Sequence, residues 1–395
     1  MKEVIIAGSA RTPIGDFLGS LKTVAPVELA KVAANAAIER SGISKDKITE
    51  VGAGHALKAG HKGNPARQVQ IGLELPIEGT AYTVDQQCAS GMKAFDLVYQ
   101  SISLGKSDVG LALGMESMSQ TAYLLPGVRE GYRLGDGGAP VDSMLHDGLV
   151  CAMMGYHMGM TAENLAEEYK VTREEQDEIA CLSHTRAVAA QEAGLFNDEI
   201  VPVEVATRKG PVTVSVDEHP RKDISIESLA GLKPAFKKEG GTVTPGNASG
   251  LNDAAAAIVL VAGDKAGELG VKPLAKVLST VNFGVEPRVM GIGPAFAVPK
   301  AIEAAGLKAE DIGYYEINEA FAAQFIACNR LLKLDMEKVN ANGSGIGLGH
   351  PVGCTGARII IALINELKRR KERYGVASLC VGGGPAMATV IENIL

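Results

Sequence analysis

Two stretches of this chain, AIERSGISKDKITEVGAGHA at residues 37–56 and AIEAAGLKAEDIGYYEINEA at residues 301–320, align with each other without a gap. In both, the end of an apolar helix pattern is followed by a glycine, Gly42 or Gly306, which is the residue typical of a helix C-terminus. An acidic turn and a strand-like run come next. Such self-similarity indicates that the chain consists of two similar halves.

The similarity between the halves continues along the chain. CASGMKAFDLVYQSI (88–102) followed by SDVGLALGMESM (107–118) resembles CTGARIIIALINEL (354–367) followed by GVASLCVGGGPAM (375–387). Each pair has a glycine near the helix start, an apolar helix and a strand-like run that ends at small residues. This alternation predicts an α/β fold with a parallel or mixed sheet covered by helices. A functional site is expected where the halves meet.

Residues 120–248 differ in kind from both halves. They begin with a Gly- and Pro-rich segment and continue with a helical stretch whose capping box pairs Thr172 with Glu175. A long insertion of this kind commonly covers a site or mediates assembly. The predicted units are an N-terminal half of residues 1–119 plus 249–270, an inserted loop domain of residues 120–248 and a C-terminal half of residues 271–395.

Composition excludes several classes of protein. A chain of 395 residues exceeds the size at which a single hydrophobic core usually keeps growing, so two or more domains or two fused halves are expected. The net charge of −7 argues against a nucleic-acid binder. No apolar run is long enough for a signal peptide or a membrane span, so we expect a cytoplasmic protein. The histidines lack partners at ligand spacing, so no metal site is expected. The six cysteines lie too far apart for a disulfide scaffold: Cys88, Cys151, Cys181, Cys328, Cys354 and Cys380.

Cys88 lies where a β-like run, GTAYTVDQQ, changes into a helix with an apolar face. At such a strand-to-helix elbow the helix dipole and free backbone N–H groups are expected to favour the thiolate, which is the reactive form of the residue. The alternative is a buried, inert thiol in the core, which is common for an isolated cysteine.

The glycine-rich segment NANGSGIGLGHPVGCTGARI at residues 340–359 surrounds a single histidine, His350. Glycines let the backbone pass close to a ligand, and His350 would project from such a loop. A dinucleotide-binding loop is the rival interpretation. It is disfavoured because the G-x-G-x-x-G spacing does not fit, and because a His-Pro pair stands where the helix should begin.

Two further segments carry candidate groups. In SLCVGGGPAM, Cys380 ends a strand-like run and precedes three glycines, whose N–H groups are suited to an oxyanion site. In EINEAFAAQF, Asn318 lies where a strand-like run changes into an alanine-rich helix. The alternative for Asn318 is a structural role as the N-cap of that helix.

Taken together, these segments resemble the thiolase family, and in particular its acetyl-CoA acetyltransferases. The resemblance spans essentially the whole chain. It rests on an ordered set of motifs: SARTPIG, the Cys88 elbow, GMESMS, YHMGMTAENLAEEY, TREEQD, GTVTPGNASGLND, NEAFA, GLGHPVG and CVGGG. The resemblance implies a thiolase fold, in which two βαβαβαββ halves related by a pseudo-twofold axis form α-β-α-β-α layers with an inserted loop domain.

The resemblance also implies an activity, namely condensation of two acetyl-CoA to acetoacetyl-CoA and CoA, and the reverse thiolysis, without a cofactor. Cys88 would be the acylated nucleophile, His350 its base, and Cys380 the acid/base toward the second acyl-CoA. Asn318 would hold a water that forms one oxyanion hole with His350. The N–H groups of Cys88 and Gly382 would form the other.

Contacts with CoA are implied for a further set of positions in or near the insertion. These CoA-binding residues are His157, Met158, Arg221, Ser228, Ser249, Ala320 and Phe321. The family resemblance also implies a homotetramer built as a dimer of dimers. The expected partners are acetyl-CoA, acetoacetyl-CoA and CoA, with no nucleic acid and no membrane.

The chain departs from the family pattern near the expected acyl site, with Ala89 in place of glycine and DGLVCAMMGYHMG in place of a more aromatic, polar stretch. A degradative 3-ketoacyl-CoA thiolase that acts on longer chains is therefore the alternative function. A ketoacyl-carrier-protein synthase would pair its cysteine with two histidines, whereas the corresponding residues here are Asn318, His350 and Cys380. A non-catalytic CoA-binding partner is disfavoured because all four catalytic positions are filled.

Overall fold

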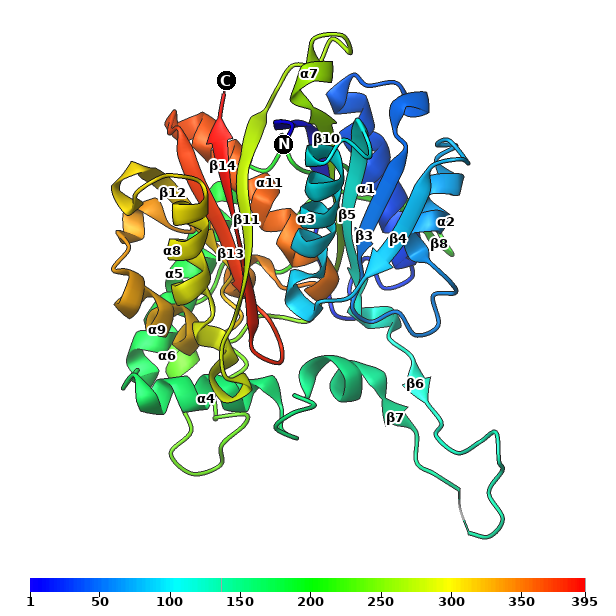
Figure 1. Ribbon diagram of the computed structural model, residues 1–395. Coiled ribbons are helices and arrows are strands. Elements are labelled where there is room, and N and C mark those ends of the chain that lie inside the picture. Colours follow the sequence, from blue (N-terminus) through cyan, green and yellow to red (C-terminus); the bar gives the residue numbers. More distant parts are fainter. Residues whose placement is uncertain (136, 395) are drawn as a thin grey trace.

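A computed structural model describes residues 1–135 and 137–394 of the chain (Figure 1). A sheet of ten strands runs through it. In spatial order the strands are β12 (Ile312–Ile317), β13 (Tyr374–Cys380), β14 (Pro385–Asn393), β11 (Ala275–Gly284), β1 (Val4–Arg11), β10 (Asn252–Ala262), β5 (Val109–Ser117), β3 (Glu50–Gly54) and β4 (Thr80–Val84), with the two-residue β2 (Gly15–Asp16) beside β10.

The strand order repeats in the two halves. In the first half β3 is parallel to β5, and β5, β10 and β1 are successive antiparallel neighbours. In the second half β12, β13, β14 and β11 follow the same order with the same directions. The halves join where β1 and β11 pair antiparallel over Val4 to Ile6. The two similar halves predicted from the sequence are therefore present.

Helices divide the molecule into layers. In the middle of Figure 1, α3 (Ser90–Ser103) and α11 (Val352–Arg370) pack against each other between the two groups of strands. The outer helices are α1 (Pro26–Ser41) and α2 (Pro65–Gly72) on the first half, and α8 (Pro294–Ala304) and α9 (Ala322–Leu332) on the second. The predicted α-β-α-β-α layering is thus confirmed.

Strand β10 shows why both faces of the sheet must be covered. Its even-numbered residues from Ala254 to Ala262 pack into the central cluster that includes α3 and α11. Its odd-numbered residues from Ala255 to Val261 pack against α1 on the opposite face. Because side chains of a strand alternate between faces, an unbroken apolar run is buried on both sides.

The inserted segment has little regular structure near its start, where a long hairpin extends away from the body (Figure 1). Its elements are β6 (Tyr123–Leu124), β7 (Val141–Asp142), the π-helix η4 (Met144–Leu149), α4 (Met158–Glu168), α5 (Arg173–Glu192), β8 (Val203–Thr207), β9 (Gly210–Val214) and α6 (Ile226–Ala230). The predicted capping box of Thr172 and Glu175 begins α5.

The remaining elements are short. They are α7 (Gly263–Ala266), α10 (Gly345–Leu348) and the 3-10 helices η1 (Lys45–Lys47), η2 (Gln87–Ala89), η3 (Met118–Gln120), η5 (Pro287–Ile292), η6 (Ala309–Asp311) and η7 (Met336–Lys338). Among the described residues, no helix has both the length and the apolar character that crossing a bilayer requires.

Candidate active site

Cys88 lies in η2, between the end of β4 and the start of α3, as the predicted elbow requires. Gln87 has a left-handed backbone with φ +47°. The hydroxyl of Ser90 accepts the N–H of Gln86 at 2.9 Å and donates to the carbonyl of Gln87 at 2.7 Å. These bonds hold a sharp turn. The turn brings the half-buried Cys88 to the wall of a cavity of about 390 Å³.

The expectation that the elbow favours the thiolate is wrong for the resting protein. Burial raises the pKa of the Cys88 thiol to about 11, although the N–H groups of Gly382 and of Cys88 itself act in the opposite direction. Removal from water destabilises the thiolate more than the two backbone N–H dipoles stabilise it. Cys88 is therefore a neutral thiol at rest, and a base must remove its proton during reaction.

His350 lies on the wall of the same cavity, between α10 and α11. Its Nδ1 is 2.6 Å from the hydroxyl oxygen of Thr355, and that hydroxyl donates to the carbonyl of Pro351 at 3.0 Å. The hydroxyl proton is thus used, so Nδ1 carries the imidazole proton and Nε2 keeps a free electron pair. Nε2 is buried and has no hydrogen-bond partner among the described protein atoms.

Burial, with a smaller effect of Arg358, lowers the pKa of His350 to about 3. A charged imidazolium is costly in this dry site, and the nearby guanidinium repels it. His350 is consequently neutral over the physiological range. A neutral imidazole with a free Nε2 has the form that a general base needs.

Asn318 lies just past the end of β12 and is fully buried. Neither its Oδ1 nor its Nδ2 has a hydrogen-bond partner within residues 1–135 and 137–394. The alternative role as an N-cap is wrong, because α9 begins at Ala322 and its N-cap position is Phe321. Buried amides are normally hydrogen-bonded, so the unpaired side chain of Asn318 suits contact with a water or a ligand.

Cys380 ends β13 and is fully buried in a cluster with Met158, Ala320 and Phe321. Burial first, and then the electrostatic interaction with Cys88 when both thiols ionise, raise the pKa of Cys380 well above its ordinary value. The second effect requires the two thiols to be neighbours. Gly382, two residues further on, lines the cavity with Cys88 and His350.

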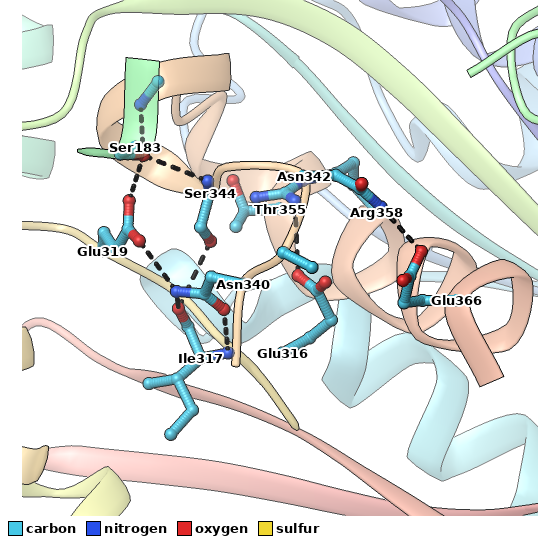
Figure 2. A network of polar contacts seen from close by, with 12 residues as sticks. Ser183, Glu316, Ile317, Glu319, Asn340, Asn342, Ser344, Thr355, Arg358 and Glu366 are labelled. Atoms are coloured by element: carbon cyan, nitrogen blue, oxygen red, sulfur yellow. Dashed lines mark hydrogen bonds and ion pairs between the residues drawn. The ribbon is translucent and has the colours of Figure 1, made fainter. Parts of the chain in front are cut away.

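A buried network fixes the two loops that carry Asn318 and His350 (Figure 2). The carboxylate of Glu319 accepts from Ser183 at 2.5 Å and from Asn340 at 2.8 Å. Asn340 also bonds both backbone groups of Ile317, at 2.9 and 2.8 Å. Ser183 in turn accepts the N–H of Ser344 at 3.2 Å. The insertion, through Ser183 on α5, therefore braces the loops that carry Asn318 and His350.

Five of the predicted CoA-binding residues line the cavity that holds Cys88 and His350. They are His157, Met158, Ser249, Ala320 and Phe321. The ring of His157 stacks on Phe236 with centroids 4.5 Å apart, and Phe236 meets Phe321 edge to face. The N–H of Ser249 donates to the carbonyl of Ala320 at 3.0 Å. The wall of the cavity is thus built from the insertion and both halves together.

The other two predicted CoA-binding residues, Arg221 and Ser228, do not lie on this cavity. They line a separate surface cavity of about 400 Å³ together with Lys222, Asp223 and Ile224. Ser228 also completes a capping box with Ser225 at the start of α6. Two cations at this second cavity suit a phosphate-bearing group.

Several residues at the site carry no signal in the sequence. Phe236, Met290 and Leu145 line the cavity but belong to no recognisable motif. Thr355, five residues after His350, faces it only because the chain turns from the loop into α11. A histidine and a threonine five residues apart are not expected to touch, because contacts along a helix join residues three or four apart. The pairing was therefore found only in the structure.

Comparisons with known proteins agree with this geometry. The thiolase N-terminal domain family matches residues 4–264, and the thiolase C-terminal domain family matches residues 271–393. The acetyl-CoA acetyltransferase of Syntrophomonas wolfei is 48% identical over 396 residues, and that of Escherichia coli strain K12 is 47% identical over 395. Each alignment covers 100% of both chains.

Solved structures give the same result. The structure of acetyl-CoA acetyltransferase from Syntrophomonas wolfei superposes with a TM-score of 0.97 at 51% identity and covers 100% of both chains. Human mitochondrial 3-ketoacyl-CoA thiolase superposes with a TM-score of 0.97 at 39% identity, covering 100% of this chain and 99% of that one. The chain belongs to the thiolase family. The predicted family, fold and class of enzyme are thereby confirmed.

Proposed function

We propose that the protein is an acetyl-CoA acetyltransferase that joins two acetyl-CoA into acetoacetyl-CoA and CoA, and catalyses the reverse thiolysis. The single observation that carries this proposal is the shared cavity of Cys88, His350 and Gly382, in which two backbone N–H groups act on the Cys88 sulfur. Full-length relatives that bear the name acetyl-CoA acetyltransferase support it.

In the first half-reaction, Nε2 of His350 takes the proton of Cys88 while the sulfur attacks the thioester carbon of acetyl-CoA. The N–H groups of Cys88 and Gly382 stabilise the oxyanion that forms. CoA leaves as a thiol after receiving the proton of Cys380, which becomes a thiolate, while His350 keeps the proton on Nε2 and the acetyl group stays on Cys88. A thiol suits this role because it is both a good nucleophile and a good leaving group.

In the second half-reaction, Cys380 removes a proton from the methyl group of a second acetyl-CoA, and the resulting carbanion attacks the acetyl carbon on Cys88. The Nε2–H that His350 gained from Cys88 and a water held by Asn318 donate hydrogen bonds to the enolate oxygen and stabilise it. The sulfur of Cys88 then leaves and recovers its proton from Nε2 of His350. The buried, unpaired amide of Asn318 supports its part in this step.

We propose that residues 120–248 form the inserted CoA-binding and tetramerisation domain. His157, Met158, Ser249, Ala320 and Phe321 would contact pantetheine or the acyl group at the first cavity. Arg221 and Ser228 would contact the nucleotide end at the second. The supporting observation is that the two cavities carry different chemistry, largely apolar side chains around Cys88 and cationic side chains around Arg221.

A homotetramer is part of the same proposal. Strand β4 is the outer strand of the sheet, so its edge is open to a second copy. The hairpin of the insertion exposes apolar side chains, among them Leu134 at 98% exposure, together with Tyr123 and Leu125. Light scattering coupled to gel filtration tests this assembly. We also propose a cytoplasmic location, in keeping with six free cysteines.

The experiment that tests the proposed function measures kcat/KM for thiolysis of 3-ketoacyl-CoA substrates of increasing chain length. The proposal predicts the highest value for acetoacetyl-CoA. A maximum at longer chains would favour the degradative 3-ketoacyl-CoA thiolase. No turnover of any member of the series would contradict both functions.

A further inference from the structure

The backbone of His350 is held by a hydrogen bond to a residue of the first half of the chain. The backbone N–H of His350 donates to Oδ1 of Asn252 on β10 at 2.9 Å. Asn252 is fully buried, and its Nδ2 donates to the carbonyl of Gly15 at 3.1 Å and to a carboxylate oxygen of Asp16 at 3.2 Å. Because both acceptors lie on the Nδ2 side of the Asn252 amide, its Oδ1 is turned toward His350.

The loop before His350 is shaped to meet Asn252. Gly349 has φ +100°, a conformation that side chains rarely adopt, and a Cβ on it would lie 2.6 Å from Oδ1 of Asn252. Only glycine therefore fits between the amide and the loop. A shift of the Asn252 amide must move the His350 peptide with it.

Asp16 is itself fixed by a segment of the insertion. Nδ1 of His219 lies 2.5 Å from the carboxylate oxygen of Asp16 that also accepts from Asn252. The two preceding residues bind the same N-terminal region: Asp217 pairs with Arg11 at 2.7 Å, and Glu218 accepts the N–H of Asp16 at 2.9 Å. Residues 217–219, which we call the strap, are anchored at three consecutive positions.

The strap also faces the proposed CoA site. A Cβ on Gly250 would lie 2.9 Å from Nε2 of His219, so His219 packs directly behind the Ser249 wall of the catalytic cavity. Arg221, two residues beyond His219, lines the second cavity. Burial acts to raise the pKa of Asp16, but the hydrogen bond with His219 and the charge of Arg221 outweigh it and lower that pKa.

We propose that Asn252 is a positioning residue for His350, and that Asp16 and His219 position it in turn, so that the strap joins the CoA-binding wall to the catalytic base. The inference rests on the proposed function, because it assigns roles within that reaction. None of the three side chains touches the reacting atoms. Their effect reaches the chemistry through the peptide of His350, which sets where Nε2 points.

The test measures the rate constant for acetylation of Cys88 by acetyl-CoA in rapid-mixing experiments, followed by intact-protein mass spectrometry, together with the KM for acetyl-CoA. Asn252→Ala should lower the rate constant about 100-fold, since small misplacement of a catalytic group costs about this factor. The KM should change less than about threefold, because no substrate contact is lost. His219→Ala and Asp16→Ala should each lower the rate constant about tenfold.

Two variants separate positioning from a general effect of altering the insertion. His219→Asn can place an amide N–H where Nδ1–H stands, so it should recover most of the rate lost in His219→Ala. Glu204→Gln changes an exposed side chain on β8 of the insertion, outside the strap. It should acetylate at the wild-type rate.

An Asn252→Ala protein with the wild-type acetylation rate would overturn the inference, and so would a Glu204→Gln protein as slow as His219→Ala. If Asn252→Ala does not fold, the His219 and Asp16 variants decide by the same criterion, since wild-type rates in both would also overturn it. Failure of wild-type protein to acetylate Cys88 would instead contradict the proposed function.

Discussion

The hydroxyl of Thr355 lies between Nδ1 of His350, at 2.6 Å, and the carbonyl of Pro351, at 3.0 Å. This one contact assigns the imidazole proton to Nδ1 and leaves Nε2 free to take a proton. Thr355 therefore selects the tautomer of His350. It does so through His350 and not through any contact with a substrate. The role is the same as that of a group which orients a catalytic histidine in other acyl-transfer sites.

Replacing Thr355 tests this role. Thr355→Val keeps the shape of the side chain but removes the acceptor for Nδ1–H, so either tautomer becomes possible. We expect kcat to fall about 10- to 100-fold, the range typical of lost general-base orientation. Thr355→Ser retains the hydroxyl and should stay within about threefold of wild type. Steady-state thiolysis assays measure both, and equal rates in the valine and serine variants would contradict the tautomer assignment.

Asn318 gives a second prediction. Its unpaired, buried amide is proposed to hold the water that stabilises the enolate. Asn318→Ala should lower kcat for condensation about 100- to 1000-fold, as removal of one oxyanion-hole donor does in other enzymes. Acetylation of Cys88 should be affected much less, because its oxyanion is bound by the N–H groups of Cys88 and Gly382. Equal losses in both half-reactions would contradict this division of roles.

Ser183 gives a prediction about stability. Its hydroxyl donates to Glu319 and accepts the N–H groups of Ser344 and Gly347, the latter at 3.0 Å. Ser183→Ala leaves these buried groups without a partner and should lower the free energy of unfolding by about 1–3 kcal/mol. Urea denaturation measures the loss. Ser215→Ala, at an exposed position, is the control and should change stability by less than about 0.5 kcal/mol.

Glu316 makes stability depend on pH. Burial raises the pKa of this carboxyl from 4.5 to about 8, while Arg358 and the hydroxyl of Tyr314 oppose the shift. Between these values the folded protein keeps a proton that the unfolded chain has lost, so the contribution of Glu316 to stability is complete below about pH 4.5 and declines up to about pH 8.

The free energy of unfolding of the wild type should fall between pH 5 and pH 8, because unfolding releases about one proton from Glu316 in this range. Glu316→Gln has no such proton to release, so its free energy of unfolding should fall less. Urea denaturation at several pH values provides the measurement. Glu310→Gln, on the surface, should keep the wild-type pH dependence. A Glu316→Gln protein with the same dependence would show that the carboxyl is ionised in the folded state.

Much of the fold followed from the repeat of residues 37–56 in residues 301–320, because a helix end, a glycine and a strand recur in the same order. The cavity shared by Cys88, His350 and Gly382 was likewise predictable once the motifs were placed at the junction of the halves. Local pattern and tertiary structure agree at these positions.

Other features depend on neighbours that are distant in sequence. The pKa of Cys88 is the result of a competition between burial and nearby N–H groups, and the sequence indicates only the second effect. Asn252 is 98 residues from His350. His219 reaches Asp16 only because the insertion returns to β2, near the N-terminus. Contacts of this kind carry no periodic signal, so the structure was needed to find them.

The central claim is that an acetyl group is carried on Cys88. Intact-protein and peptide mass spectrometry after brief exposure to acetyl-CoA tests it most directly, with Cys88→Ala and Cys380→Ser measured beside the wild type. We predict one added acetyl group on Cys88 in the wild type and in Cys380→Ser, none in Cys88→Ala, and condensation by the wild type alone. Acetylation at another residue, or acetylation that persists in Cys88→Ala, would contradict the mechanism.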